Sequence, residues 1–210
     1  MKQLVIIGAG GFGREVLAWA RAGAINYAIK GFLDDNPAAA SDSRLRAQCL
    51  GALESYSPSK NDVFLCAVGT PALRQSITER IKGCGGKFIT LVHPTAIVTE
   101  GAQLSDGVII CPNALVSVDA RIGEGAVVYY HSSVDHDAII GPWTQISGHC
   151  DVTGGASLGQ GVFLGSHATV LPRIRVGDYA IVGAGAVVTC DVEARATVVG
   201  VPARPHLGSV

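Results

Sequence analysis

His136 is the residue of this chain best placed for acid–base chemistry, because it stands between two carboxylates, Asp135 and Asp137. A carboxylate that accepts a hydrogen bond from one imidazole nitrogen fixes the tautomer and leaves the other nitrogen able to take up a proton. His136 follows Val134 by two residues, and Val134 belongs to a periodic series of aliphatic residues. The spacing therefore puts His136 at a corner outside the packed core, where the alternative to a general base is a solvated histidine.

A second candidate for chemistry is a glycine-rich turn near the N-terminus, which contains Gly8, Gly10, Gly11 and Gly13. It follows an apolar run at residues 4–7, which reads as a buried strand, and precedes residues 14–22, which read as a helix. In a strand–turn–helix unit, glycines let the backbone approach a phosphate at the positive end of the helix dipole. The alternative is a turn that is tight for structural reasons only.

Two acids, Asp34 and Asp35, end a second expected strand at residues 31–35. Asp34 lies 21 residues after Gly13, about where a dinucleotide-binding fold places its ribose-binding carboxylate. A third expected strand, residues 63–68, ends at Gly69. Three short strands are half of the arrangement that binds NAD. A mononucleotide or nucleotide-sugar site therefore fits this segment better, although a solvated strand end would also explain the two acids.

The element that must position His136 is a six-residue repeat. Every sixth residue from Val92 to Val188 is aliphatic, and the residue four positions after each is small or branched. A six-residue unit cannot bury an apolar face alone, whereas stacked copies can, so this period predicts a parallel β-helix. Glycine follows the large aliphatic residue at six places, which we interpret as tight corners: Gly123, Gly141, Gly159, Gly165, Gly177 and Gly183.

Composition limits the remaining choices. The chain is 48% hydrophobic, but no apolar run approaches the roughly 18 residues that span a bilayer, and the run at residues 4–7 is too short for a signal peptide. The six cysteines show no Cys-x-x-Cys spacing, which argues against a zinc knot or a disulfide framework. A net charge of -1 without a basic run argues against nucleic acid as a partner. We expect a cytoplasmic protein of two domains, residues 1–90 and 91–210.

The repeat resembles the left-handed β-helix of the hexapeptide acyltransferases, in which three short strands make a coil of eighteen residues. About five such coils, with strands about 4.8 Å apart, would make a prism roughly 25 Å long. Further motifs resemble, more narrowly, the sugar O- and N-acyltransferases related to the sialic acid O-acetyltransferases and to the bacillosamine-pathway N-acetyltransferase. These motifs are the glycine turn of residues 8–13, Leu33-Asp34-Asp35, Ala67-Val68-Gly69 followed by Arg74, and the closing run of residues 199–204.

A coil of eighteen residues sets two further expectations. Gly154 follows His136 by eighteen residues, so its backbone N–H should lie one strand away and could hold an oxyanion, the role that the resemblance also implies. His131, His149 and His167 share the same spacing and should form a column, which we interpret as a packed or solvated row at a subunit seam. A zinc site like that of γ-type carbonic anhydrases would need its third ligand at Thr95, so we predict no metal.

The resemblance implies roles for individual residues. His136 would be the catalytic base and Asp137 its partner, where relatives usually have glutamate. Asp34 and Asp35 would bind the base and ribose of a nucleotide, and the glycine turn its phosphates. The acetyl-CoA residues would be Gln145, Ser166, Ala184 and Arg204. Two departures are Phe12, where relatives often carry histidine, and Gln145, which replaces a second histidine near the acetyl group.

We therefore predict an α/β, Rossmann-like nucleotide-sugar-binding domain followed by a left-handed β-helix that forms a homotrimer. The expected activity is acetyl-CoA-dependent N-acetylation of a nucleotide-linked amino sugar, for bacterial surface glycan synthesis. The alternatives are O-acetylation of sialic acid or another sugar, a non-catalytic nucleotide-sugar-binding protein and, third, an NAD oxidoreductase. Consumption of acetyl-CoA separates the enzyme from the binding protein.

Overall fold

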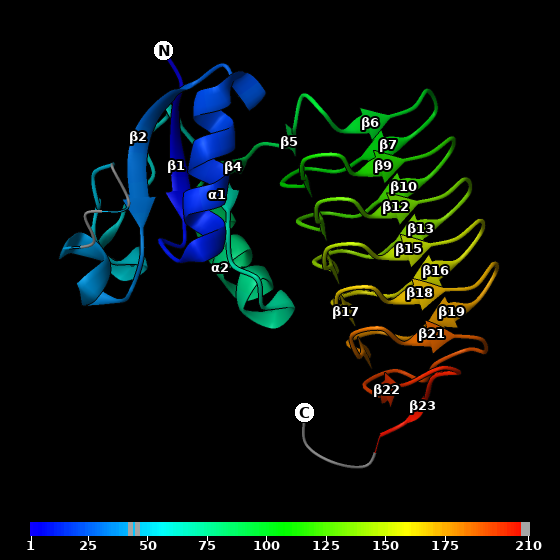
Figure 1. The fold of residues 1–210 in the computed structure, drawn as a ribbon. Helices are drawn as coiled ribbons and strands as arrows, with labels where there is room; N and C mark the ends of the chain where they lie inside the picture. The colour runs from blue at the N-terminus through cyan, green and yellow to red at the C-terminus, as the bar shows by residue number, and fades with distance from the viewer. Residues whose placement is uncertain (42–43, 45–46, 207–210) are drawn as a thin grey trace. The chain divides into compact units, whose positions relative to one another are not determined.

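The computed structural model describes residues 1–41, 44 and 47–206. The chain divides into two compact units, Met1–Leu91 and Val92–Val210 (Figure 1). The first is an α/β unit and the second is a β-helix, so the predicted fold class is confirmed.

The first unit is built on a parallel sheet with the strand order β2-β1-β3-β4. The strands are β1 (Gln3–Ile7), β2 (Ala28–Leu33), β3 (Asp62–Cys66) and β4 (Lys87–Phe88). The sequence predicted three strands; β4 was missed because a two-residue strand carries too little periodicity to be read. The second strand ends at Leu33, so Asp34 and Asp35 follow the sheet instead of ending it.

Helices connect these strands. They are α1 (Gly11–Trp19), which continues as the π-helix η1 (Ala20–Ala24), and α2 (Pro71–Gly83), together with the short 3-10 helices η2 (Pro37–Ser41) and η4 (Leu53–Ser55). Val5, Ile7 and Phe64 from the sheet pack with Ile77 and Ile81 from α2 in one buried cluster. The carboxyl ends of β1 and β2 therefore have a rigid base, and the glycine turn and Asp34 extend from that edge.

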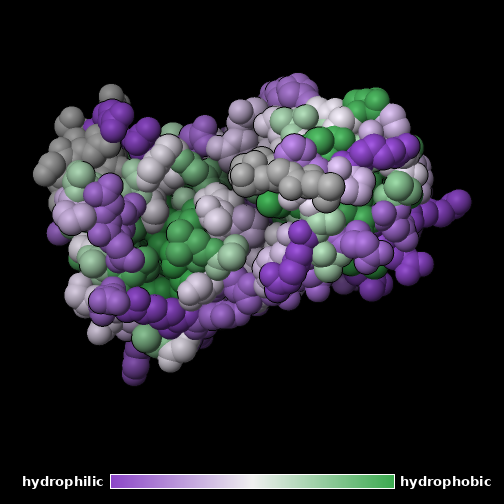
Figure 2. Space-filling view, turned by 90° about the horizontal axis from the view of Figure 1, so that it is seen from below, coloured by the Kyte–Doolittle hydropathy of each residue, from purple (hydrophilic) through white to green (hydrophobic). Residues whose placement is uncertain are grey.

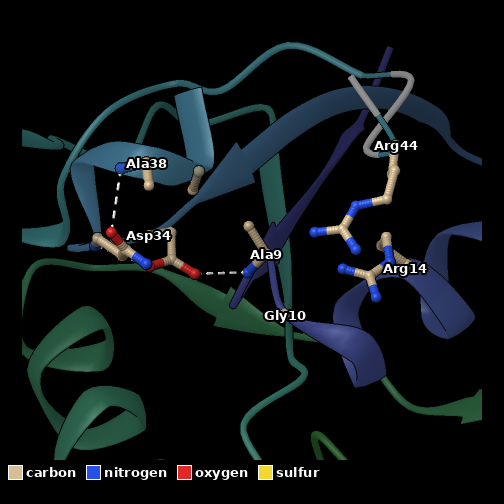
Figure 3. A pocket seen from close by; sticks show the side chains of 8 residues that line it. Ala9, Gly10, Arg14, Asp34, Ala38 and Arg44 are labelled. Carbon is tan, nitrogen blue, oxygen red and sulfur yellow. Dashed lines mark hydrogen bonds between the residues drawn. The ribbon is translucent and has the colours of Figure 1, made fainter. Parts of the chain in front are cut away.

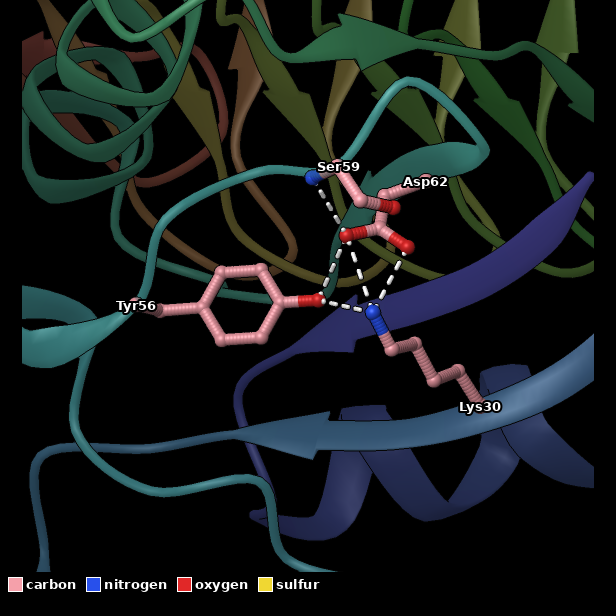
Figure 4. Close-up of polar contacts among 4 residues, drawn as sticks. All are labelled: Lys30, Tyr56, Ser59 and Asp62. Carbon is pink, nitrogen blue, oxygen red and sulfur yellow. Dashed lines mark hydrogen bonds and ion pairs between the residues drawn. The ribbon is translucent and has the colours of Figure 1, made fainter.

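A polar cluster around the buried carboxylate of Asp62 anchors the segment before β3 (Figure 4). The Lys30 ammonium donates to both carboxylate oxygens of Asp62, at 2.8 and 3.0 Å, and the Tyr56 hydroxyl and the Ser59 N–H donate to the same carboxylate. Burial by itself raises the pKa of Asp62, but these hydrogen bonds outweigh it and lower the pKa to about 2. The ionised carboxylate thus ties β2, β3 and the intervening chain together.

The second unit is a prism with three sheets as its faces (Figure 1). Face one contains β5 (Leu91–Val92), β8 (Ile109–Ile110), β11 (Val127–Val128), β14 (Gln145–Ile146), β17 (Phe163–Leu164), β20 (Ile181–Val182), β22 (Thr197–Val199) and β23 (Arg204–Pro205). Face two contains β6 (Ile97–Val98), β9 (Leu115–Val116), β12 (Ser133–Val134), β15 (Asp151–Val152), β18 (Thr169–Val170) and β21 (Val187–Val188). Face three contains β7 (Gln103–Leu104), β10 (Arg121–Ile122), β13 (Ile139–Ile140), β16 (Ser157–Leu158) and β19 (Arg175–Val176). We call the corner between faces one and two the first corner, and the corner between faces two and three the second corner.

The inside of the prism is filled by the predicted aliphatic ladders, which are buried from Ile110 to Val188. Three polar residues occupy small positions inside it, and each is satisfied by a corner carbonyl. Ser132 Oγ donates to Ser147 O at 2.7 Å, Thr144 Oγ1 to Gly159 O at 2.8 Å, and Cys150 Sγ to Gly165 O at 3.1 Å. The core therefore tolerates these polar side chains without unpaired hydroxyl groups.

The glycines after the aliphatic residues stand at tight corners with no room for a Cβ, as predicted. The left-handed backbone conformation falls two residues later, at positions such as His131 and Asp137, which are not glycines. Gly123 and its equivalents are required by close approach between coils, since a Cβ at Gly123 would lie 2.6 Å from Pro142 N. The corner is thus tight because neighbouring coils nearly touch, and not because of the torsion angles at these glycines.

The prism has about six coils instead of the predicted five. Val192 pairs with Val176 and Val198 pairs with Val182, so the spacing shortens to 16 residues in the last coil (192 − 176 = 198 − 182 = 16). Both valines join the core. A strict six-residue count loses the repeat after Val188, which is why the sequence did not predict this coil.

Hydrophobic residues also reach the surface, as patches among hydrophilic ones in the view of Figure 2. Exposed large apolar side chains of the prism include Ile97 on face two, Ile139 on face three and Val201 beyond β22. None of the helices in the described residues is both long and apolar enough to cross a membrane.

Candidate functional site

His136 and Asp137 lie at the second corner, directly after β12, and both side chains are exposed. His136 Nδ1 lies 2.8 Å from Asp137 Oδ2. Because a carboxylate accepts, this contact puts the ring proton on Nδ1 and leaves Nε2 with a free lone pair. The left-handed conformation of Asp137, with φ at 60°, turns its carboxylate back towards the preceding ring. The pair therefore has the geometry of an oriented general base.

Gly154 lies beneath the imidazole of His136, one coil further along the same corner. A Cβ placed on Gly154 would lie 2.6 Å from His136 Nε2 and 2.7 Å from Cε1. Backbone hydrogen bonds from Gly155 N to His136 O and from Arg173 N to Gly154 O hold the neighbouring coils in register. The N–H of Gly154 has no acceptor among the described residues, so beside Nε2 there is one unoccupied backbone donor. Acyl transfer requires a general base and a hydrogen-bond donor close to the same reacting carbonyl group.

The residues expected to bind acetyl-CoA occupy a different edge of the prism. Ser166 and Ala184 are exposed at the first corner, after β17 and β20, while His136 is at the second corner. Gln145 is buried on β14, and Arg204 is exposed on β23, where its Nη1 donates to Ala203 O. One chain therefore does not bring these residues together with His136, because the width of face two separates the two corners.

His131, His149 and His167 form the expected column at the first corner. Their ring centroids are 5.1 and 4.8 Å apart, and the planes are inclined by 13° and 2°. Parallel rings direct their nitrogen lone pairs side by side instead of towards one point, so the column does not chelate an ion. The described residues contain no group of three histidine, cysteine, aspartate or glutamate side chains that could hold a metal.

The first unit contains an open pocket of about 480 Å³ at the carboxyl edge of its sheet (Figure 3). It is lined by Ala9, Gly10, Arg14, Asp34, Asn36, Ala38, Ala39 and Arg44. Asp34 Oδ2 accepts from the N–H of Ala9 at 2.6 Å, and Oδ1 accepts from Asn36 N at 2.8 Å. The Asp34 carboxylate therefore connects two parts of the pocket lining, the glycine turn at Ala9 and the segment after β2 at Asn36.

Two arginines face this pocket, and the sequence did not single them out. The guanidinium groups of Arg14 and Arg44 point towards the same space beside Gly10 in Figure 3. Arg14 was predictable in principle, because it lies in the first turn of the helix that follows the glycines. Arg44 carries no comparable sequence signal, since only the folding of the chain after β2 places it here. The pocket thus has cationic side chains opposite the carboxylate of Asp34.

The other residues predicted for this site have different surroundings. Gly8 has a φ of 96°, and a Cβ placed on it would lie 2.8 Å from the carbonyl oxygen of Ala67. A glycine at this position therefore lets two turns pack closely. A Cβ at Gly11 would lie 4.0 Å from Arg14 Nη2, which is an ordinary contact, and Gly69 has no other described residue near its would-be Cβ. Asp35 does not line the pocket, and its Oδ1 accepts from Leu53 N at 2.7 Å, at the start of η4. Gly10 and Asp34 are the predicted substrate residues that do line it.

Comparison with known proteins agrees with this division into two parts. The family model described as PglD N-terminal domain matches residues 3–81, and the bacterial transferase hexapeptide model matches residues 155–190. The curated UDP-N-acetylbacillosamine N-acetyltransferase of Bacillus subtilis (strain 168) is 32% identical over 121 residues. That match spans 52% of this chain and about half, 51%, of the relative's own length.

Solved structures match over nearly the whole chain. The acetyltransferase domain of PglB from Neisseria gonorrhoeae FA1090 is 30% identical, with a TM-score of 0.91, and the match covers 98% of this chain and 100% of that one. PerB from Caulobacter crescentus, solved in complex with CoA and GDP-perosamine, is 29% identical with a TM-score of 0.89 and 98% coverage of both chains.

A hexapeptide β-helix preceded by a small α/β unit defines a protein of the bacterial transferase hexapeptide class. Within that class, the chain belongs to the sugar acyltransferase family that includes the bacillosamine N-acetyltransferase and the acetyltransferase domain of PglB.

Proposed function

We propose that this protein transfers the acetyl group of acetyl-CoA to the amine of a nucleotide-linked amino sugar. The observation that carries the proposal is the second corner, where His136 Nε2, oriented by Asp137, lies against Gly154, whose N–H is unoccupied. The names of the relatives support the choice of substrates, because one is a UDP-N-acetylbacillosamine N-acetyltransferase and PerB was solved with CoA and GDP-perosamine. A cytoplasmic location belongs to the same proposal.

In the proposed reaction, the sugar nitrogen attacks the thioester carbonyl carbon, and His136 Nε2 takes up the proton that the nitrogen loses. The oxyanion that forms accepts a hydrogen bond from the N–H of Gly154. The carbon–sulfur bond then breaks, and the imidazolium returns its proton to the departing thiolate. Asp137 stabilises the positive charge that the ring carries between the two steps. The products are an amide and CoA with a free thiol.

The nucleotide would bind in the pocket of the first unit. Its diphosphate fits the side lined by Gly10, Arg14 and Arg44, where backbone and guanidinium groups favour negative charge. The ribose or base would meet Asp34 and Asn36 on the other side. Asp35 is engaged by Leu53 N, which supports an indirect role for it in holding this edge of the sheet.

The separation of the two corners supports a homotrimer. Within one chain, Ser166 and Ala184 lie across face two from His136. Acetyl-CoA bound along the first corner of one copy can therefore reach a His136 only if the second corner of another copy lies beside it. Exposed apolar side chains such as Ile97 and Ile139 on the prism faces favour such an association. Activity that rises with assembly in sedimentation experiments would support this part of the proposal, and a fully active monomer would refute it.

The test is a reaction of acetyl-CoA with a panel of UDP-, dTDP- and GDP-linked amino sugars, followed by mass spectrometry and by a thiol assay for free CoA. We expect one acetylated product and an equal amount of thiol, and His136→Ala should lower kcat by about 10²–10⁴-fold. The variant should unfold at the wild-type temperature, because the side chain is exposed.

The same experiment separates the alternatives. An acetyl group that hydroxylamine removes would be an ester, which would point to O-acetylation of a sugar hydroxyl. Binding of the nucleotide sugar with no consumption of acetyl-CoA would refute the enzyme and leave a binding protein. Wild-type turnover in a correctly assembled His136→Ala variant would show that the base has been assigned wrongly.

A further inference from the structure

The histidine column of the first corner ends in an empty position. His131, His149 and His167 all adopt the left-handed conformation, with φ of 57°, 61° and 63°. The next residue in the column is Gly185, which has the same conformation with φ at 70°. Apart from its two chain neighbours, none of the described residues has an atom within 4 Å of the place where a Cβ of Gly185 would be. The coil after His167 therefore continues the column's backbone but contributes no ring.

Among the residues that the structure describes, the coil after His167 therefore leaves one face of the His167 imidazole open. Its other face is covered by His149, at 4.8 Å and nearly parallel. His167 and Gly185 are both exposed, so the open face can be reached from solvent. A planar ring placed on that face would extend the stack of three imidazoles by a fourth ring. Stacking of a base on an aromatic side chain strengthens binding by roughly 5- to 150-fold, as judged by substitution with alanine.

The position of this gap along the prism indicates which ring would fill it. His131 is in the same coil as His136, and Gly185 lies three coils of eighteen residues later, or about 14 Å along the axis. If acetyl-CoA lies along the first corner with its thioester at the level of His136, its nucleotide end comes near Gly185. Ser166 and Ala184, the positions expected for the pantetheine arm, immediately precede His167 and Gly185.

A cationic group lies at the same end of the prism. Arg204 is exposed on β23, and the segment before it contacts the strand that follows Gly185, since Ala203 N donates to Val187 O at 2.8 Å. A guanidinium there suits a phosphate of the same nucleotide. On the basis of the proposed function, we infer that the adenine ring of acetyl-CoA stacks on the open face of His167, in the space left by Gly185.

The test compares acetyl-CoA with S-acetylpantetheine, which has the thioester and the arm but lacks the adenosine. Gly185→His should place a fourth imidazole in the gap, and the backbone accepts histidine because three histidines of this column already have the same conformation. We expect the KM for acetyl-CoA to rise about tenfold, in line with the loss of one stacking interaction. The KM for S-acetylpantetheine should stay unchanged. His167→Ala should have the same selective effect.

His131→Ala is the matched control, since it removes the far end of the column and leaves the face of His167 open. It should leave the KM for both donors unchanged. Equal losses with both donors in Gly185→His, or no loss with either, would overturn the inference. Matching thermal unfolding of the variants and the wild type would exclude a folding defect.

Binding of adenosine 3′,5′-bisphosphate, measured by calorimetry, keeps this inference separate from the proposed function. Binding to the wild type and loss of binding in Gly185→His would support the stacking site even if no amino sugar were acetylated. Absence of binding to the wild type would refute the site even if acetyl transfer were observed.

Discussion

Gly154→Ala tests the catalytic corner with a single added methyl group. The substitution keeps the backbone N–H, so it separates the steric role of the glycine from its role as a hydrogen-bond donor. The new Cβ would lie 2.6 Å from His136 Nε2, whereas an ordinary contact is about 3.5 Å. The ring must therefore retreat by roughly 1 Å, and a misplacement of that size costs on the order of 10²-fold in rate. We expect kcat to fall about 100-fold.

The assay is acetyl transfer under saturating substrates, combined with a double-mutant cycle. In a His136→Ala background the ring is absent, so Gly154→Ala should cost little more, which corresponds to a coupling of about 2–3 kcal/mol. Gly148→Ala is a control for stability, because its Cβ would meet the Tyr130 ring at 2.8 Å in the other corner. Both glycine variants should lose similar thermal stability. Wild-type turnover in a folded Gly154→Ala variant would refute the reasoning.

Three further predictions follow from the contacts. Asp137→Asn should lower kcat less than His136→Ala, since an amide oxygen can still accept from Nδ1; an equal loss in single-turnover kinetics would contradict this. Asp34→Asn should weaken nucleotide-sugar binding about tenfold, because one of its two backbone partners loses its acceptor, and calorimetry should find acetyl-CoA binding unaffected. Asp62→Asn should lower the free energy of unfolding by about 2 kcal/mol near pH 7, from a pKa that falls from 3.8 to about 2. Because the pKa of Asp62 is lower in the folded state, this stability is present above pH 3.8 and is lost as the pH falls towards 2. The difference in free energy of unfolding between Asp62→Asn and wild type, measured with urea, should therefore shrink over that range. A constant difference would argue against the ion pair with Lys30.

The β-helix and the position of His136 could be predicted from the sequence because their cause is local and periodic. An inward valine at every sixth residue fixes which side chains enter the prism, so it also fixes that His136, two residues after Val134, stays outside. The one-coil relation between His136 and Gly154 follows from the same count once a coil has three strands. The column of His131, His149 and His167 was predictable for this reason too.

The pocket of the first unit and the details of the corners depended on tertiary structure. No periodicity places Arg44 opposite Asp34, because the path of the chain after β2 brings it there. Only the stacked coils show which atom excludes a Cβ at Gly123, namely the backbone nitrogen of Pro142 in the next coil. Only the folded prism shows that His136 and Ser166 lie on different corners. Two residues share a corner only when their numbers differ by a whole number of coils of eighteen residues. His136 and Ser166 differ by thirty residues, so they do not share one.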